Sequence, residues 1–314
     1  MPWSFRSSPF LCNAAVSAAR VCRLVALMPL YLVANSTPVQ ADVLYQGTLG
    51  KRPIQLFGDA AYGRIDAAYV YQRYDTPIRL RGSFVDGIAV IDEFDAAGEL
   101  AARLRLIDFD PAAAVWHGEW TSLDGKRTLP IRLQREFAID GSDQAEPDRR
   151  YPQAASDESR YFQLLVRKPA GDYYPRVVAL EVYRKGSDEL LQRIEVNTEF
   201  RGLHGVSIGN YNFDERPDLA LFEASYAGPN TSSLYFLQQA DGRYVQAEFS
   251  GTSLEFDAER KLVYEHNQCC AGRSHMNATY QVVGNRLELI ERRCNEYDEK
   301  TDDLVEVPCD GDDQ

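Results

Sequence analysis

The sequence predicts an all-β protein made of antiparallel meanders that form two β-domains. Three observations lead to this fold class. Alternating polar and apolar residues recur along the chain, turn dipeptides such as Asp-Gly separate these runs, and no stretch after residue 41 keeps a 3.6-residue apolar period. A sandwich, an open barrel or propeller-like blades are all compatible with this pattern. Helices are expected to be short and few.

The first 41 residues have the layout of a secretory signal peptide. Three arginines precede the apolar run at residues 24–34, and the small-residue sequence VQA ends at Ala41. The run is about half the ~20 residues that a membrane span needs, and Pro29 interrupts it. We therefore expect a mature chain that begins near Asp42, is exported to the periplasm or beyond, and has no membrane attachment.

The net charge of the chain limits the classes of partner that it can bind. The leader holds three of the 34 basic residues and none of the 47 acidic ones, so the mature chain carries a net charge of −16. Such a chain repels nucleic acid and anionic membranes, and favours cationic partners or divalent metal ions. Solubility alone is the other explanation of this charge.

Two domains are expected on either side of a polar linker. In the first, residues 42–138, hairpins are predicted around Asp86-Gly87 and Asp124-Gly125. Residues 139–157 are rich in Asp, Pro and Ser and are predicted to be the linker. In the second domain, residues 158–311, turns are predicted at Asp241-Gly242 and Gly284-Asn285.

Four cysteines remain after the leader, and an even number in an exported chain favours two disulfides. A bond between the two adjacent cysteines would need a strained ring, so each is expected to pair with one of the other two. The alternative is a zinc site, because two histidines flank the adjacent thiols. The residues are Cys269, Cys270, Cys294 and Cys309, with His266 and His275 for zinc.

A ladder of oxygen-bearing side chains predicts a calcium loop in the second domain. Calcium loops use side-chain oxygens at positions one, three, five and nine and a backbone carbonyl at position seven. In this register the ligands are Asn210, Asn212, Asp214, Arg216 through its carbonyl, and Asp218. Glu215 stands where glycine would accept a left-handed turn, which favours a weak or structural site. The alternative is a polar turn whose side chains bond their own backbone.

No catalytic group can be assembled from the sequence. Ser207 lies in GVSIG, a nucleophile-elbow pattern, but an acidic loop and Pro217 follow where the elbow needs a helix. Asp92, Glu93 and Asp95 lie close together, as expected of a solvated edge in an acidic chain. The protein is therefore expected to be a binding protein and not an enzyme.

A resemblance appears at the calcium ladder. The segment YNFDERPDLALFEASYAGPNTSSLYFL, residues 211–237, resembles the NFDG-x-x-DL segment of periplasmic immunity proteins. These proteins inhibit lysozyme-like effectors that bacteria inject into rivals through a type IV secretion system, and are similar in architecture to inhibitors of invertebrate-type lysozymes. The resemblance covers about residues 161–291 and implies an all-β fold, bound calcium and a lysozyme-like peptidoglycan hydrolase as partner. The chain departs from the pattern at Asn210 and Glu215.

The loop that follows the ladder is the expected contact with the hydrolase. Residues 224–233 are small and polar except for Tyr226, so the loop is expected to project from the fold. Tyr226, with Ser225 and Asn230 beside it, is predicted to enter the enzyme's active site.

Two other functional classes remain open. A carbohydrate-binding or adhesion module could use Trp116 and Trp120, which a spacing of four places on one face of a strand, although a buried pair explains them too. A hydrolase acting through Ser207 is the third class. The first domain, which opens near Tyr45, resembles a small β-domain of other exported bacterial proteins, and this resemblance implies no function.

Overall fold

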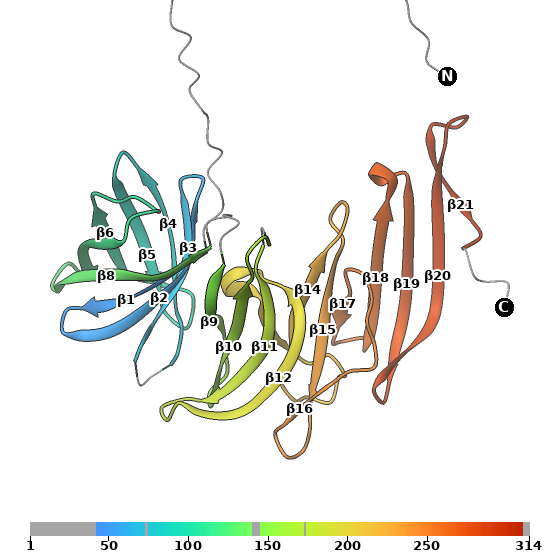
Figure 1. The fold of residues 1–314 in the computed structure, drawn as a ribbon. Coiled ribbons are helices and arrows are strands. Elements are labelled where there is room, and N and C mark those ends of the chain that lie inside the picture. Colours follow the sequence, from blue (N-terminus) through green and yellow to red (C-terminus); the bar gives the residue numbers. More distant parts are fainter. Residues whose placement is uncertain (1–41, 73–74, 140–144, 173, 310–314) are drawn as a thin grey trace, which may run out of the picture. The chain divides into compact units, whose positions relative to one another are not determined.

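The structure is a computed structural model that describes residues 42–72, 75–139, 145–172 and 174–309. The predicted signal peptide lies outside these residues. In the described chain, antiparallel strands form a closed barrel followed by three open sheets, and the two helices are 3₁₀ turns of three residues each (Figure 1). The all-β prediction is confirmed. No helix in the described ranges has both the length and the apolar character that crossing a bilayer requires.

Eight strands form the barrel, which closes because β1 pairs with both β2 and β8. Closure leaves no unpaired edge in this part of the fold. The predicted turns at Asp86-Gly87 and Asp124-Gly125 join β4 to β5 and β7 to β8. The strands are β1 (Asp42–Leu49), β2 (Arg52–Ala61), β3 (Arg64–Tyr71), β4 (Ile78–Val85), β5 (Ile88–Phe94), β6 (Leu100–Ile107), β7 (Val115–Ser122) and β8 (Thr128–Ile139).

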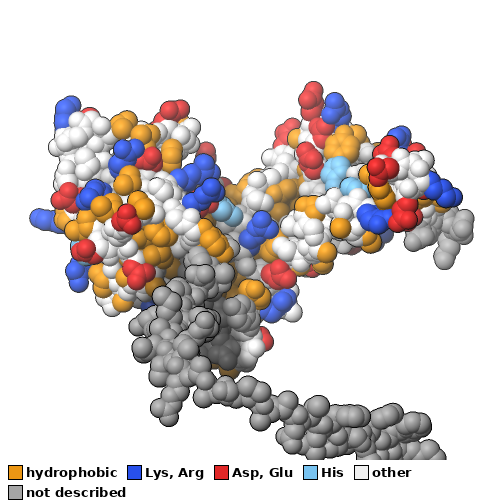
Figure 2. Space-filling model, turned by 90° about the horizontal axis from the view of Figure 1, so that it is seen from above, with side chains coloured by type: hydrophobic (Ala, Val, Ile, Leu, Met, Phe, Trp, Pro, Cys, Tyr) orange, Lys and Arg blue, Asp and Glu red, His pale blue; other side chains and the backbone are white. Residues whose placement is uncertain are grey.

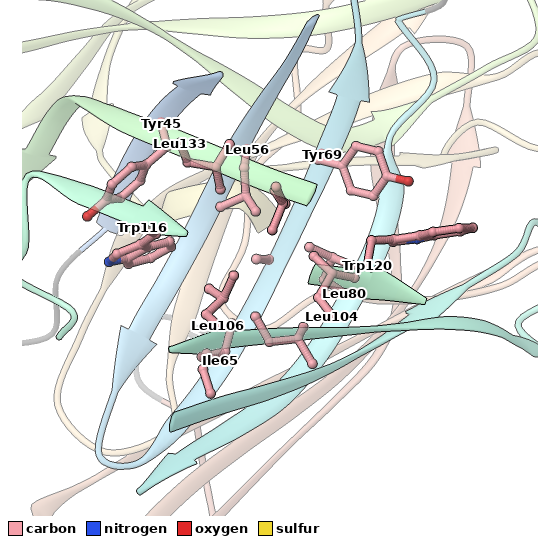
Figure 3. Packing of buried hydrophobic residues seen from close by; sticks show 14 of the residues in the cluster. Tyr45, Leu56, Ile65, Tyr69, Leu80, Leu104, Leu106, Trp116, Trp120 and Leu133 are labelled. Carbon is pink, nitrogen blue, oxygen red and sulfur yellow. The ribbon is translucent and has the colours of Figure 1, made fainter. Parts of the chain in front are cut away.

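Alternate side chains of these strands fill the barrel (Figure 3). Tyr45 and Trp116 stack with their ring centroids 4.0 Å apart, and Phe109 packs against the same tryptophan. Across the interior, Tyr69 and Trp120 lie among leucines of the other strands. The interior is therefore a packed core and not an open ligand cavity.

The next sheet has the order β12-β11-β10-β9, and its first strand corrects the predicted linker. Residues 140–144 lie outside the described residues, but 146–156 form β9, which pairs with β10. Tyr151 on β9 is fully buried, which gives this polar segment an apolar anchor. The strands are β9 (Glu146–Ser156), β10 (Arg160–Lys168), β11 (Arg176–Arg184) and β12 (Glu189–Glu199), followed by η1 (Gly202–His204).

Two further sheets complete the chain. The third has the order β13-β14-β15-β16 and the fourth the order β17-β18-β19-β20-β21. The predicted turns at Asp241-Gly242 and Gly284-Asn285 join β15 to β16 and β19 to β20. The elements are β13 (Val206–Gly209), β14 (Asp218–Ser225), β15 (Thr231–Gln238), β16 (Tyr244–Gln246), β17 (Glu255–Asp257), β18 (Leu262–Cys269), η2 (Cys270–Gly272), β19 (Ser274–Val283), β20 (Arg286–Asp298) and β21 (Asp303–Val307).

A second apolar cluster crosses the predicted domain boundary. It contains Phe57 and Phe137 from the outside of the barrel, Phe162 from the second sheet and Phe236 from the third. The barrel wall thus packs on both faces, and the predicted first and second domains share this core.

Candidate functional site

The ladder residues lie in the loop between β13 and β14. The main-chain N–H of Asp214 donates to Asn210 Oδ1 at 2.9 Å and to Asn212 Oδ1 at 3.1 Å. The Asp214 carboxylate accepts from the N–H of Arg216 and pairs with its guanidinium at 3.0 Å. The side chains therefore stabilise the loop by bonding its backbone.

Asp218 has a different environment, because its side chain is fully buried at the start of β14. One carboxylate oxygen accepts the N–H of Tyr211 at 2.9 Å, and the other accepts the N–H of Gln238 at 2.8 Å. Burial raises the pKa of Asp218 above its ordinary value, while the two amides oppose this shift. Asp218 thus joins the beginning of the loop to the end of β15.

The loop fits calcium in the kind of ligand it offers. Asn210 and Asn212 supply amide oxygens, which are ligands that calcium accepts, and both oxygens converge on the N–H of Asp214. Glu215 has a φ of 71°, which is the left-handed conformation that glycine would adopt without strain. No group of three or more His, Cys, Asp or Glu side chains in the described ranges is arranged to hold a metal. The Asp214 carboxylate would have to break its salt bridge with the Arg216 guanidinium before it could bind an ion.

The predicted contact loop is shorter than expected. β14 continues to Ser225 and β15 begins at Thr231, so residues 226–230 alone form the connection. The Tyr226 side chain is 53% exposed. Its N–H donates to the carbonyl of Asn230 at 2.9 Å, and its hydroxyl lies 3.1 Å from Ser232 Oγ. The aromatic ring is therefore presented to solvent from a closed turn.

The structure corrects the role expected for Asn230. Its side chain is buried, with Nδ2 donating to Asn267 Oδ1 at 3.0 Å and to the Gln268 carbonyl at 2.7 Å, and Oδ1 accepting from the Gln268 N–H. At the other end, the N–H of Ser225 donates to Glu199 Oε2 at 3.1 Å. Asn230 is thus an anchor that fixes the Tyr226 loop to β18, and the contact surface is centred on Tyr226.

The structure has one disulfide among the four cysteines where two were predicted, and the predicted pairing is wrong. Cys294 bonds to Cys309 and joins β20 to the chain after β21. Cys269 and Cys270 are exposed thiols whose sulfurs lie 3.0 Å apart. Sequence could not give this pairing, because it depends on which strands become neighbours.

The histidines of the alternative zinc site have other partners. His266 Nδ1 lies 2.8 Å from Asn277 Oδ1, and His275 Nε2 lies 2.9 Å from the Gly272 carbonyl. Each imidazole is therefore engaged in another hydrogen bond. Within the described residues, the two histidines and the two thiols do not form a metal-ligand set.

The candidate catalytic residues also have structural partners. Ser207 is exposed on β13, with its Oγ 3.0 Å from the Tyr211 hydroxyl. Asp92 pairs with Arg103, and Asp95 caps the β5–β6 turn through two backbone amides. Glu93 is buried and accepts hydrogen bonds from two aromatic residues of the barrel, Tyr69 at 2.9 Å and Trp120 at 2.6 Å.

The two tryptophans proposed as a sugar platform are buried inside the barrel. Trp116 is 2% exposed and Trp120 is 9% exposed. Figure 3 shows both rings among the core side chains. A stacking surface made of these two residues is therefore excluded, and the alternative explanation of a buried pair is confirmed.

Sequence reasoning missed a polar crevice outside the barrel, with a volume of about 810 Å³. Its lining includes Gln46, Gln55, Gln72 and Gln163, and none of these side chains hydrogen-bonds to another described residue. Gln46 and Gln55 are direct cross-strand partners on β1 and β2. Pairing register is what brings these amides together, and no local motif reveals it.

Two carboxylates lie in the same crevice. Asp188 accepts a hydrogen bond from the Tyr161 hydroxyl at 2.9 Å, and Asp75 accepts one from the N–H of Gly186 at 3.1 Å. Burial, with a smaller contribution from the charge of Asp188, raises the pKa of Asp75. The crevice therefore combines neutral amides with hydrogen-bonded acids.

The negative charge is spread over the surface. Figure 2 shows acidic and basic side chains interspersed on the face in view. Several acids of the described chain are paired with arginines, as in Asp148 with Arg167 and Glu189 with Arg184. The charge therefore acts mainly as a long-range field.

No protein-family model matches the sequence, and no curated protein is significantly similar to it.

Proposed function

We propose that this protein is an exported binding protein that inhibits a lysozyme-like cell-wall hydrolase, with Tyr226 entering the active-site cleft of the enzyme. The observation that carries this proposal is an exposed aromatic side chain on a loop whose two ends are fixed, at Glu199 on one side and at β18 through Asn230 on the other. A loop already held in one conformation loses little entropy on binding.

The chemistry of the loop suits a cleft that normally holds a sugar chain. Such a cleft presents carboxylates and hydrogen-bonding groups. The loop offers a phenol ring at residue 226, and exposed small residues at 227 and 228 let the chain approach closely. The overall acidic charge accelerates encounter with a basic enzyme, while a central aromatic anchor supplies most of the affinity.

The test is inhibition of purified lysozyme-like enzymes on peptidoglycan. Tyr226→Ala should weaken inhibition by about 2 kcal/mol, roughly thirtyfold in the inhibition constant, without lowering the melting temperature. Tyr62→Ala is the matched control, because Tyr62 is 69% exposed on the barrel. Equal inhibition by the wild type and Tyr226→Ala would contradict the role of the loop, and no inhibition of any enzyme in the panel would contradict the function.

A second candidate function, carbohydrate binding, is favoured by the crevice with four uncommitted glutamines. Amide groups both donate and accept hydrogen bonds, which matches the hydroxyls of a neutral sugar. Gln55→Leu should weaken binding of an N-acetylglucosamine tetramer roughly tenfold by calorimetry, as expected for the loss of about one good hydrogen bond. Gln134→Leu, on the barrel strand β8 but outside the crevice lining, should have no effect.

A further inference from the structure

The adjacent thiols of Cys269 and Cys270 stand at the end of β18, where η2 begins. Both side chains are exposed, and their sulfurs face each other at 3.0 Å. This separation is hydrogen-bonding distance for two thiols and exceeds a disulfide bond by about 1 Å. The two sulfurs therefore lie close enough to bond to each other, in the strained ring that a disulfide between adjacent residues requires.

The backbone around the pair has an uncommon conformation. Cys270 has a φ of 56° and Ala271 a φ of 57°, so two successive residues with side chains are left-handed. Each such residue carries backbone strain that glycine would avoid. The chain does have a glycine next, Gly272, at a φ of 80°. The left-handed conformation at Cys270 accompanies the close approach of its sulfur to that of Cys269.

The pair also lies beside the Tyr226 loop. A cavity of about 210 Å³ is lined by Ala227 and Gly228 on one side and by residues 268–272 on the other. Asn230 bonds both main-chain groups of Gln268, the residue before Cys269. The position of the thiols is therefore fixed against the loop and open to a small reagent.

We propose that Cys269 and Cys270 form a dithiol site that reduces a disulfide-bearing molecule by exchange and closes into a disulfide between neighbouring residues. In the first step, the Cys269 thiolate attacks one sulfur of the incoming disulfide, forms a mixed disulfide and releases one thiolate. In the second, Cys270 loses its proton to water and attacks Cys269 Sγ, which releases the other thiolate. The two electrons lost by the pair reduce the incoming disulfide to two thiols.

The order of attack follows from the contact between the two groups. The hydrogen bond and the negative charge of Cys269 raise the pKa of Cys270, so Cys270 holds its proton more tightly than a free thiol would. Cys269 then attacks first, and Cys270 completes the exchange. This chemistry does not depend on the proposed inhibition of a hydrolase.

The experiment uses the reduced full chain with oxidised glutathione, followed by acid quenching, digestion and mass spectrometry of the peptide that contains both cysteines. In the wild type, this peptide should lose two hydrogens, and the internal disulfide should exceed the glutathione adduct roughly tenfold, because the second thiol acts at a high effective concentration. Cys270→Ser should retain glutathione on Cys269, since no second thiol can displace it.

Cys269→Ser should keep its glutathione adduct on Cys270, since no second thiol can displace it. The Cys294→Ser/Cys309→Ser variant is the control for disulfide shuffling, and its Cys269–Cys270 peptide should oxidise as in the wild type. Accumulation of two glutathione adducts on the wild-type peptide, or of dimers linked through it, would overturn the proposal. Melting curves of each variant establish that the fold is intact.

Discussion

The barrel and the C-terminal sheet, β17 to β21, are built from the same kind of antiparallel hairpin but are stabilised differently. Twenty buried residues fill the barrel in one cluster. In the strands of the C-terminal sheet, only Val263, Glu265 and Ala278 are buried. Its main apolar contacts outside the sheet are made by partly buried residues, among them Phe256 and Leu287, which pack on the third sheet.

This difference follows from topology. A closed barrel encloses one face of every strand, so each inward side chain loses its contact with water. An open sheet with few covering elements leaves both faces partly wet, and its stability comes mainly from backbone ladders and local constraints. The C-terminal sheet has such a constraint in the bond between Cys294 and Cys309.

The largest expected effect is in the barrel. Trp116 stacks on Tyr45, packs against Phe109 and donates its indole N–H to the Asp110 carbonyl at 2.8 Å. Trp116→Ala would leave a cavity and remove one of the two hydrogen bonds that the Asp110 carbonyl accepts, so the free energy of unfolding should fall by about 3–5 kcal/mol. Urea unfolding followed by circular dichroism measures this loss. A loss below about 1 kcal/mol would mean that the barrel is not held by its core.

The second effect concerns the C-terminal sheet. The disulfide joins residues 15 apart in sequence, and a loop of that length predicts about 3 kcal/mol from the restricted unfolded chain. Replacing Cys294 and Cys309 by serine should therefore increase hydrogen exchange in β20 and β21. Exchange in β2 and β5 of the barrel should stay unchanged. Equal acceleration in both regions would show that they unfold as one unit and would remove the contrast.

The same contrast explains what the sequence could predict. Asp86-Gly87 and Gly284-Asn285 specify their turns locally, so hairpins were predicted equally well in both regions. Barrel closure depends on β1 meeting β8, about 90 residues later, which no local pattern specifies. The polar composition of β9 predicts a linker, although Tyr151 anchors this strand in the core.

The features of the candidate site also fall into those that local sequence predicts and those that depend on distant residues. The ladder and the exposure of Tyr226 could be predicted, because both depend on residues close in sequence. The anchoring of Asn230 to β18 and the gathering of the crevice glutamines depend on partners far away in sequence, and the structure was needed to find them.

A third prediction concerns the loop between β13 and β14, which lies in neither region. We propose that its five ladder positions, Asn210 to Asp218, hold calcium, which would stiffen the hairpin. With a dissociation constant of about 1 mM, typical of extracellular modules, about 10 mM calcium should raise the free energy of unfolding by roughly 1.4 kcal/mol. Differential scanning calorimetry measures the shift in melting temperature.

The matched variants are Asp214→Asn and Asp157→Asn. Asp157 caps the β9–β10 turn outside the ladder, so its variant should keep the response to calcium. Asp214→Asn removes one of the two carboxylates of the ladder and should lose it. Identical melting curves of the wild type in calcium and in chelator would contradict the site.

The smallest expected effect is at Ile290. The contrast between the barrel and the C-terminal sheet predicts that a substitution there hardly changes the free energy of unfolding. The β19–β20 ladder pairs Tyr280 with Leu289 and Thr279 with Glu291, so Ile290 is the extra residue of a bulge. Its side chain is 55% exposed and belongs to none of the apolar clusters, so Ile290→Asn should change the free energy of unfolding by less than about 0.5 kcal/mol.

The same substitution at Ile54, fully buried on β2, places an amide without partners in the barrel core. It should cost several times more, about 3 kcal/mol or above, because the lost packing adds to the burial of an unpaired polar group. Urea unfolding of the two variants side by side measures the ratio, and similar losses at both positions would show that Ile290 is covered in the folded protein.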